Sequence, residues 1–214
     1  MDVKTAIRNG DAEALRQLLA DDSALANTLV RWGANDCVVT HPLHYISDML
    51  FEGVLQRGRE LPLVEALIQA GAVLDFQRNG KGDTPLIGAA SLAAEDVGIR
   101  LVEAGAKPEP RGLFGETALH WAAMLGEDRL VARLIEGADL NLPDAKYNST
   151  ALGWAIYGWS DPGAGNVGRQ IEVVRLLVGA GARVEAGWLE SEKVRRNPEM
   201  VAALRGSGGK SGDC

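Results

Sequence analysis

The chain has 214 residues, of which 46% are hydrophobic and 24% are charged, and its formal net charge is −7. This composition is typical of a globular protein and excludes disorder over most of the length, and the 26 glycines follow no three-residue period, which excludes collagen. The acidic balance argues against nonspecific binding to nucleic acid or to an anionic membrane, and no apolar run is long enough to span a membrane.

The start of the chain and its cysteines indicate a compartment. The N-terminal segment MDVKTAIRNGDAEAL lacks the apolar block of a secretory signal. Cys37 and Cys214 are too few and too far apart to form a disulfide framework or a zinc site. We therefore expect a reduced, cytoplasmic setting.

A short motif recurs with a spacing of 33 residues, as Thr84-Pro85-Leu86, Thr117-Ala118-Leu119 and Thr150-Ala151-Leu152, and His41-Pro42-Leu43-His44 is an earlier, less regular copy. Each copy is followed by a segment rich in small residues. A threonine at the start of a helix can accept a hydrogen bond from a backbone N–H two or three residues later. The motif therefore predicts the first helix of a repeated unit, with threonine as its N-cap and with His41 as a poorer cap.

A second apolar segment follows each motif and ends at a glycine. These glycines are Gly71, Gly105, Gly137 and Gly181. The apolar residues before them recur at helical spacing, and glycine after such a helix is typical of a C-cap because it adopts the left-handed conformation at little cost. Each unit is thus predicted to be two helices, and units must stack because one alone cannot bury its apolar stripe.

Residues 84–90 (TPLIGAA) and 117–123 (TALHWAA), with the Gly-Ala-x-x-Asp/Asn endings at 71–75 and 137–141, resemble the ankyrin repeat family. The resemblance covers roughly residues 1–205. It implies an all-α, ankyrin-repeat solenoid of about five helix–turn–helix repeats with a C-terminal capping helix pair and insertions in repeats 2 and 5. The implied segments are an N-terminal capping repeat (1–35), repeat 2 with its insert (36–78), repeat 3 (79–111), repeat 4 (112–144), repeat 5 with its insert (145–185) and the C-terminal cap (186–205).

The ends and the inserts depart from the regular repeat. Residues 6–19 resemble a helix–turn–helix of the family without the Thr-Pro-Leu start, and residues 188–195 and 198–204 predict two short helices. The Gly- and Ser-rich tail, 206–214, is expected to be disordered. The inserts fall near 51–61 and 159–170; they either mark a binding face or are tolerated surface loops, and both interpretations stay open.

The histidines favour a structural role over a metal site. His41 and His44 are three residues apart and could share a helix face, but no third ligand completes a zinc site. The resemblance places His44 and His120 at the structural histidine of the family, which hydrogen-bonds near the repeat junction. We therefore expect no metal and no cofactor.

No arrangement of residues supports catalysis. No Ser-His-Asp set is legible, and Asp139, Asp144 and Asp161 are expected to be solvated loop charges. Gly209-Lys210-Ser211 lacks the earlier glycine of a P-loop. Asn148-Ser149-Thr150 fits a glycosylation acceptor, which stays silent without a secretory signal. The chain is therefore predicted not to be an enzyme.

The resemblance implies that partners bind on the concave face of the array, which is formed by the loop before each first helix and by the exposed side of that helix. The residues carried over to this face are Lys81, Asp83, Ser91 and Leu92 in repeat 3, Leu113, Phe114, Glu116, Met124 and Leu125 in repeat 4, and Lys146, Tyr147, Ser149, Tyr157 and Trp159 in repeat 5. The apolar members either form an exposed patch, which is typical of partner sites, or pack between units and under the inserts. Trp121 and Trp154 are expected to pack inside.

These observations predict a monomeric, non-enzymatic module that binds another protein on this face and binds neither nucleic acid nor membrane. The acidic charge favours a partner with a basic patch. The alternative is a pocket for a small molecule or a modified residue, formed by aromatic side chains such as Tyr157 and Trp159 together with the two inserts, because aromatic rings can enclose a cation.

Overall fold

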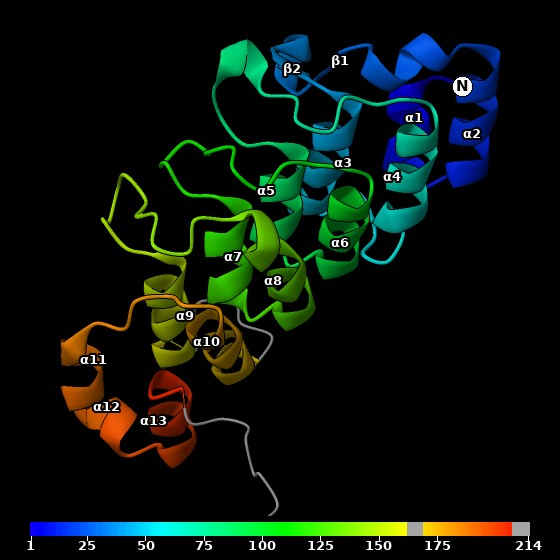
Figure 1. Ribbon diagram of the computed structural model, residues 1–214. Helices are drawn as coiled ribbons and strands as arrows, with labels where there is room; N and C mark the ends of the chain where they lie inside the picture. Colours follow the sequence, from blue (N-terminus) through cyan, green and yellow to red (C-terminus); the bar gives the residue numbers. More distant parts are fainter. Residues whose placement is uncertain (162–168, 207–214) are drawn as a thin grey trace, which may run out of the picture. The chain divides into compact units, whose positions relative to one another are not determined.

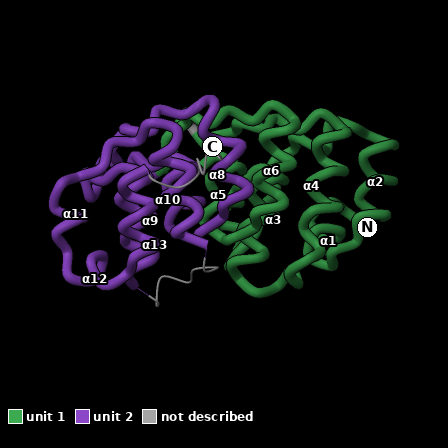
Figure 2. Tube along the Cα trace, turned by 60° about the horizontal axis from the view of Figure 1, so that its bottom comes forward, with its two compact units in different colours: residues 1–112 green, residues 113–214 purple. Residues whose placement is uncertain are grey.

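The computed structural model describes residues 1–161 and 169–206, and most of this length is helical (Figure 1). The chain divides into two compact units, residues 1–112 and 113–214 (Figure 2). No helix in the described part has the length and the apolar character needed to cross a membrane. Residues 162–168 of the second insert and residues 207–214 of the tail lie outside the described residues.

The first unit consists of stacked helix pairs. Its α-helices are α1 (Val3–Asn9), α2 (Ala12–Asp21), α3 (Pro42–Phe51), α4 (Glu60–Gln69), α5 (Pro85–Ser91) and α6 (Glu95–Glu103), and its 3₁₀ helices are η1 (Ser23–Asn27), η2 (Ala34–Asp36) and η3 (Arg78–Gly80). First helices pack on first helices, α1 on α3 and α3 on α5, and second helices pack on second helices, α2 on α4 and α4 on α6 (Figure 1). Each pair therefore covers the apolar stripe of its neighbour.

A short β-hairpin in the first unit is a departure from the all-α prediction. Strands β1 (Val30–Trp32) and β2 (Val38–Thr40) are antiparallel, with Arg31 opposite Val39. Five of the six strand residues are Val, Thr or Trp, types that suit an extended backbone. Strands of three residues are too short to show an alternating pattern, so β1 and β2 were not predicted.

The second unit repeats the same stacking and adds a C-terminal segment. Its helices are α7 (Ala118–Leu125), α8 (Asp128–Leu134), η4 (Ile135–Gly137), α9 (Ala151–Ser160), α10 (Gln170–Gly179), α11 (Ala186–Glu190), α12 (Glu192–Arg195) and α13 (Pro198–Leu204). Helix α7 packs on α9, α8 on α10, and α10 also on α13. The predicted helix over 188–195 is broken at Ser191 into α11 and α12, so three short helices stand where a pair was expected.

The recurring threonines stand at the N-caps of α5, α7 and α9. Thr84 Oγ1 accepts a hydrogen bond from Ile87 N at 3.2 Å, and Thr150 Oγ1 accepts one from Gly153 N at 3.3 Å. At α7 the arrangement is different, because the Nδ1 atom of His120 accepts the N–H of Thr117 at 3.1 Å. These bonds satisfy backbone donors that a helix start leaves without partners.

Three of the four recurring glycines end a helix in the left-handed conformation. The φ angles are 85° at Gly71, 99° at Gly105 and 101° at Gly181, and after each the alanine N–H reaches back to a leucine carbonyl five residues earlier, as in a Schellman motif. Gly137 does not fit this pattern: α8 continues into η4, and Gly137 lacks a positive φ. The reason is a deletion, since the sequence reads LIEGA there and LIQAGA, LVEAGA or LVGAGA elsewhere.

Side-chain oxygens link the ends of successive helix pairs within each unit. An Asn or Asp near the end of one pair accepts the backbone N–H of the second residue after the glycine in the next pair. These bonds are Asn27 Oδ1 to Val73 N at 2.7 Å, Asp75 Oδ1 to Lys107 N at 2.8 Å, and Asn141 Oδ1 to Arg183 N at 2.8 Å. The same contact thus fixes the spacing of neighbouring pairs in both units.

Gly105→Ala should lower the free energy of unfolding by about 1–2 kcal/mol, since an L residue is strained in the left-handed region. No heavy atom lies within 4 Å of the added Cβ, so a clash does not contribute to this loss. Gly137→Ala is the matched control and should leave stability nearly unchanged. Urea unfolding followed by circular dichroism measures both, and equal losses in the two variants would contradict the conformational assignment.

Candidate functional site

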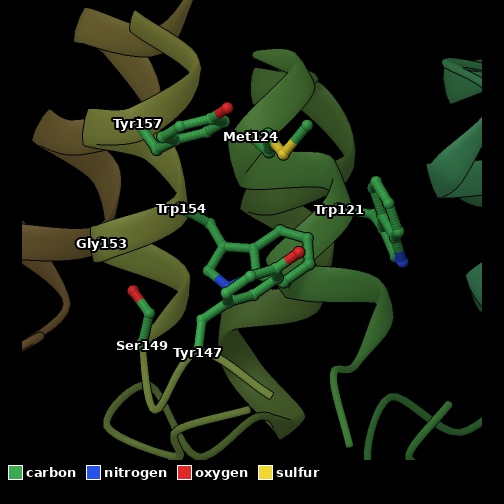
Figure 3. A pocket seen from close by; sticks show the side chains of 7 residues that line it. All are labelled: Trp121, Met124, Tyr147, Ser149, Gly153, Trp154 and Tyr157. Carbon is green, nitrogen blue, oxygen red and sulfur yellow. The ribbon is translucent and has the colours of Figure 1, made fainter. Parts of the chain in front are cut away.

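The second unit contains a pocket of about 380 Å³ between α7, α9 and the loop that precedes α9 (Figure 3). Seven residues line it: Trp121, Met124, Tyr147, Ser149, Gly153, Trp154 and Tyr157. Aromatic rings therefore dominate the wall, and the polar atoms among these side chains are hydroxyl oxygens and indole nitrogens.

Trp154 stands at the centre of this aromatic cluster. It projects from α9 toward α7 and is buried (Figure 3). The ring of Trp121 lies 5.0 Å from it at 81°, that of His120 lies 5.5 Å from it at 79°, and that of Tyr147 lies 6.2 Å from it at 68°. These edge-to-face arrangements are favoured by the ring quadrupoles and fix the orientation of each ring.

Asp144 holds the loop before α9 and orients Trp154. Its Oδ1 accepts the N–H groups of Lys146 and Tyr147 at 2.8 and 2.6 Å, and its Oδ2 accepts those of Ser149 and of the Trp154 indole at 3.0 and 3.1 Å. Burial raises the pKa of this carboxyl group, but the four hydrogen bonds outweigh burial and the pKa lies below its usual value. The prediction of a solvated loop charge was wrong, because Asp144 is only 2% exposed.

Glu116 plays a similar part before α7. Its Oε2 accepts the N–H of Phe114 at 2.8 Å, and its Oε1 accepts the indole N–H of Trp121 at 3.3 Å. The side chain is only 1% exposed, so it supports the loop and is not presented to a partner. Leu125 is also buried, which leaves it out of any exposed surface.

Two tyrosines form the exposed edge of the pocket. Tyr147 is 63% exposed and Tyr157 is 54% exposed. The Tyr157 hydroxyl donates to Asp161 Oδ2 at 3.0 Å, and this hydrogen bond raises the pKa of the phenol above its usual value. The ammonium of Lys146 lies 4.3 Å from the ring centroid of Phe114 and 4.9 Å from that of Tyr147, so cation–π attraction holds it beside the pocket.

Two glycines shape the wall that α9 contributes. Gly153 takes the place that His120 has in α7, and a Cβ there would lie 2.2 Å from Ser149 Oγ. A Cβ on Gly158 would lie 2.0 Å from the carbonyl oxygen of Met124, so α9 can approach the end of α7 only because this side chain is absent. Gly153 itself lines the pocket.

A family model of ankyrin repeats, three copies long, matches residues 50–144 and residues 93–188. The chain belongs to the ankyrin repeat family. Ankyrin repeats are generally protein–protein interaction modules, and the family is typically non-enzymatic. A search of curated proteins gives no match to the chain.

Not all the residues that the ankyrin resemblance assigned to a partner surface lie on the pocket. Met124, Tyr147, Ser149 and Tyr157 line it. Leu113 and Phe114 are exposed residues of the loop before α7, and Lys146 is exposed beside Tyr147. Trp159 does not line the pocket; it is half-buried, with the Lys193 ammonium 5.2 Å from its ring centroid.

The remaining members lie in the first unit. Lys81 is exposed, and Asp83, Ser91 and Leu92 are partly buried. The carbonyl of Asp83 accepts a hydrogen bond from His44 Nε2 at 2.7 Å, and the carbonyl of Leu92 accepts one from Arg57 at 2.9 Å. Their backbone groups therefore hold neighbouring pairs together.

His41, in the first unit, is buried among protein partners. His41 Nδ1 accepts the N–H of Leu43 at 3.3 Å, its Nε2 lies 3.0 Å from Asn27 Oδ1, and its ring stacks on Phe76 at 4.8 Å. Burial lowers the pKa of His41 to about 4. Within the described part of the chain, no group of three His, Cys, Asp or Glu side chains could hold a metal ion.

The contacts between carboxylates and indoles were not predicted from the sequence. Asp144 bonds Trp154 ten residues later and Glu116 bonds Trp121 five residues later, so the two acceptors occupy different positions of the repeat. A search for recurring positions therefore cannot find them. The available signal was chemical: a buried tryptophan requires an acceptor for its N–H, and an acidic residue in the preceding loop can supply one.

Asp144→Asn should lower the free energy of unfolding by about 2 kcal/mol at pH 7. Both oxygens of the Asp144 carboxylate accept hydrogen bonds from N–H groups, and the NH₂ group of asparagine cannot accept them. Asp139→Asn is the control, since exposed Asp139 accepts one local bond from Asn141 N and should change stability little.

The pH dependence provides a second check. Because folding lowers the pKa of Asp144 below its usual value of 3.8, its stabilisation is complete above that value and is lost as the pH falls through the folded pKa. The stability difference between the native chain and Asp144→Asn should therefore narrow in acid. Urea unfolding from pH 7 downward measures it, and a constant difference would contradict the role of the charge.

Proposed function

We propose that this ankyrin repeat chain is a non-enzymatic module that binds another protein through the surface around the pocket of the second unit. The observation that supports this most strongly is the cluster of exposed apolar and aromatic side chains there, namely Leu113, Phe114, Tyr147 and Tyr157. Exposed apolar patches occur at partner sites, and tyrosine is enriched among residues that contribute most to binding.

Preorganisation supports the same proposal. The loops before α7 and α9 each bond to a buried carboxylate, Glu116 in one and Asp144 in the other. A loop that is already ordered loses little conformational entropy when a partner binds. The exposed side chains that these loops carry are thus presented at low entropic cost.

The second candidate function is the binding of a small molecule. A pocket of about 380 Å³ with an aromatic wall lies within the usual size range of ligand sites. Residues 51–61 do not contribute to its lining. A thermal-shift screen distinguishes the candidates, because a small ligand that occupies the pocket raises the melting temperature in the absence of any protein.

The double change Leu113→Ser and Phe114→Ser should abolish capture of the partner without lowering the melting temperature by more than a few degrees, since both side chains are exposed. Affinity purification from the native cell with each variant, quantified by mass spectrometry, measures capture. Phe51→Ser is the matched control, because Phe51 is exposed at the end of α3 and lies outside the pocket. Unchanged capture by the double variant, or equal loss in the control, would contradict the proposal.

A further inference from the structure

Three rings that line the pocket donate their polar hydrogen to a carboxylate. The Trp121 indole donates to Glu116, the Trp154 indole donates to Asp144, and the Tyr157 hydroxyl donates to Asp161. The distances are 3.3, 3.1 and 3.0 Å. Each of these lining rings therefore has a carboxylate at its polar edge.

This arrangement gives the pocket a negative electrostatic character. The face of an aromatic ring is the negative end of its quadrupole, and a hydrogen bond from the ring to an anion adds electron density to it. Glu116 and Asp144 are buried, so water screens them weakly. A cation in the pocket is therefore favoured over an anion, and over a neutral group of the same shape.

The wall also discriminates among cations. None of the described residues that line the pocket carries a carboxylate, and the acceptors among their side chains are the neutral hydroxyl oxygens of Tyr147, Ser149 and Tyr157. Lysine has three N–H donors and arginine has five, and in this pocket most of them would lose water without gaining an acceptor. A trimethylammonium group has no donor to satisfy, and it presents an apolar, weakly hydrated surface to the rings.

We propose that the pocket binds a trimethylammonium group on a side chain of the partner protein, that is, a trimethylated lysine. A side chain is a better match than a free cation, because Leu113 and Phe114 extend the exposed apolar surface beyond the lining of the pocket. This inference rests on the proposed function and specifies which side chain of the partner protein enters the pocket.

One cation of the chain itself lies close to this site. The Lys146 ammonium rests between the rings of Phe114 and Tyr147 and is not part of the lining. Its charge opposes a second cation beside Tyr147, which lines the pocket. Lys146→Met should therefore increase the affinity for the trimethylated group, a change that a purely apolar pocket would not show.

Isothermal titration of the full chain with four forms of one short neutral peptide tests the proposal. The central residue is lysine, trimethyllysine, the neutral tert-butyl isostere of trimethyllysine, or acetyllysine. The trimethylated peptide should bind about tenfold more tightly than the isostere, as expected for a desolvated cation–π contact, and more tightly again than the other two. Choline carries the same trimethylammonium group as a free small molecule, and it should bind more weakly than the trimethylated peptide.

Asp161→Asn tests the electrostatic part, because it removes a charge behind Tyr157 while the ring stays in place. It should reduce the preference for trimethyllysine over the isostere severalfold. Tyr157→Ala should abolish binding of the trimethylated peptide, and Tyr157→Phe should retain most of it. Circular dichroism melting of each variant confirms that folding is intact.

Equal binding of the trimethylated peptide and its isostere, or no binding of either, would overturn the inference. Tighter binding of choline than of the peptide would also overturn it, by assigning the pocket to a small molecule. The proposed function fails separately, through unchanged partner capture by the Leu113→Ser and Phe114→Ser variant. The two failures are therefore distinguishable.

Discussion

The buried carboxylate of Asp144 is the interaction on which the site of the second unit depends. A buried charge is strongly unfavourable unless hydrogen bonds replace the water that it loses. Asp144 meets this requirement with three backbone N–H groups of its own loop and the indole N–H of Trp154. The loop can change conformation only by breaking these bonds. The same bonds that order the loop therefore fix the direction of Tyr147, which the loop carries, and of Trp154, which faces it from α9.

The features that sequence could predict are those that recur in phase. Thr84 and Thr150 cap their helices through the same backbone bond, and Gly71, Gly105 and Gly181 share one left-handed turn, because identical local geometry requires identical residues. The prediction failed where a unit departs from the pattern. A deletion of one residue before Gly137 replaces the turn with η4, and the three-residue strands β1 and β2 lack the length that reveals alternation. The carboxylate–indole bonds were not predictable by periodicity, because Trp121 and Trp154 are equivalent but their acceptors, Glu116 and Asp144, stand at different positions of the repeat.

The exposed and buried members of the predicted partner surface differ for a physical reason. Glu116 and Leu125 occupy positions that face a partner in the family resemblance, yet both are buried here. Glu116 is drawn inward because the Trp121 indole and the Phe114 amide both need an acceptor. Once Glu116 has accepted those bonds, the loop before α7 presents the apolar side chains of Leu113 and Phe114 instead. The N–H donors of Phe114 and Trp121 thus determine that Glu116 points inward and that apolar side chains remain on the surface.

Gly153 links the repeat pattern to the pocket. In α7 the equivalent residue, His120, bonds the backbone of Thr117 and packs its ring on Trp154. A histidine at position 153 would need the space now occupied by Ser149, whose Oγ would lie 2.2 Å from the added Cβ. Glycine removes that conflict. Departures from a local rule are expected at functional sites, and Gly153 lines the aromatic pocket. The wall that α9 contributes to the pocket thus includes a position at which repeat 5 departs from the family motif.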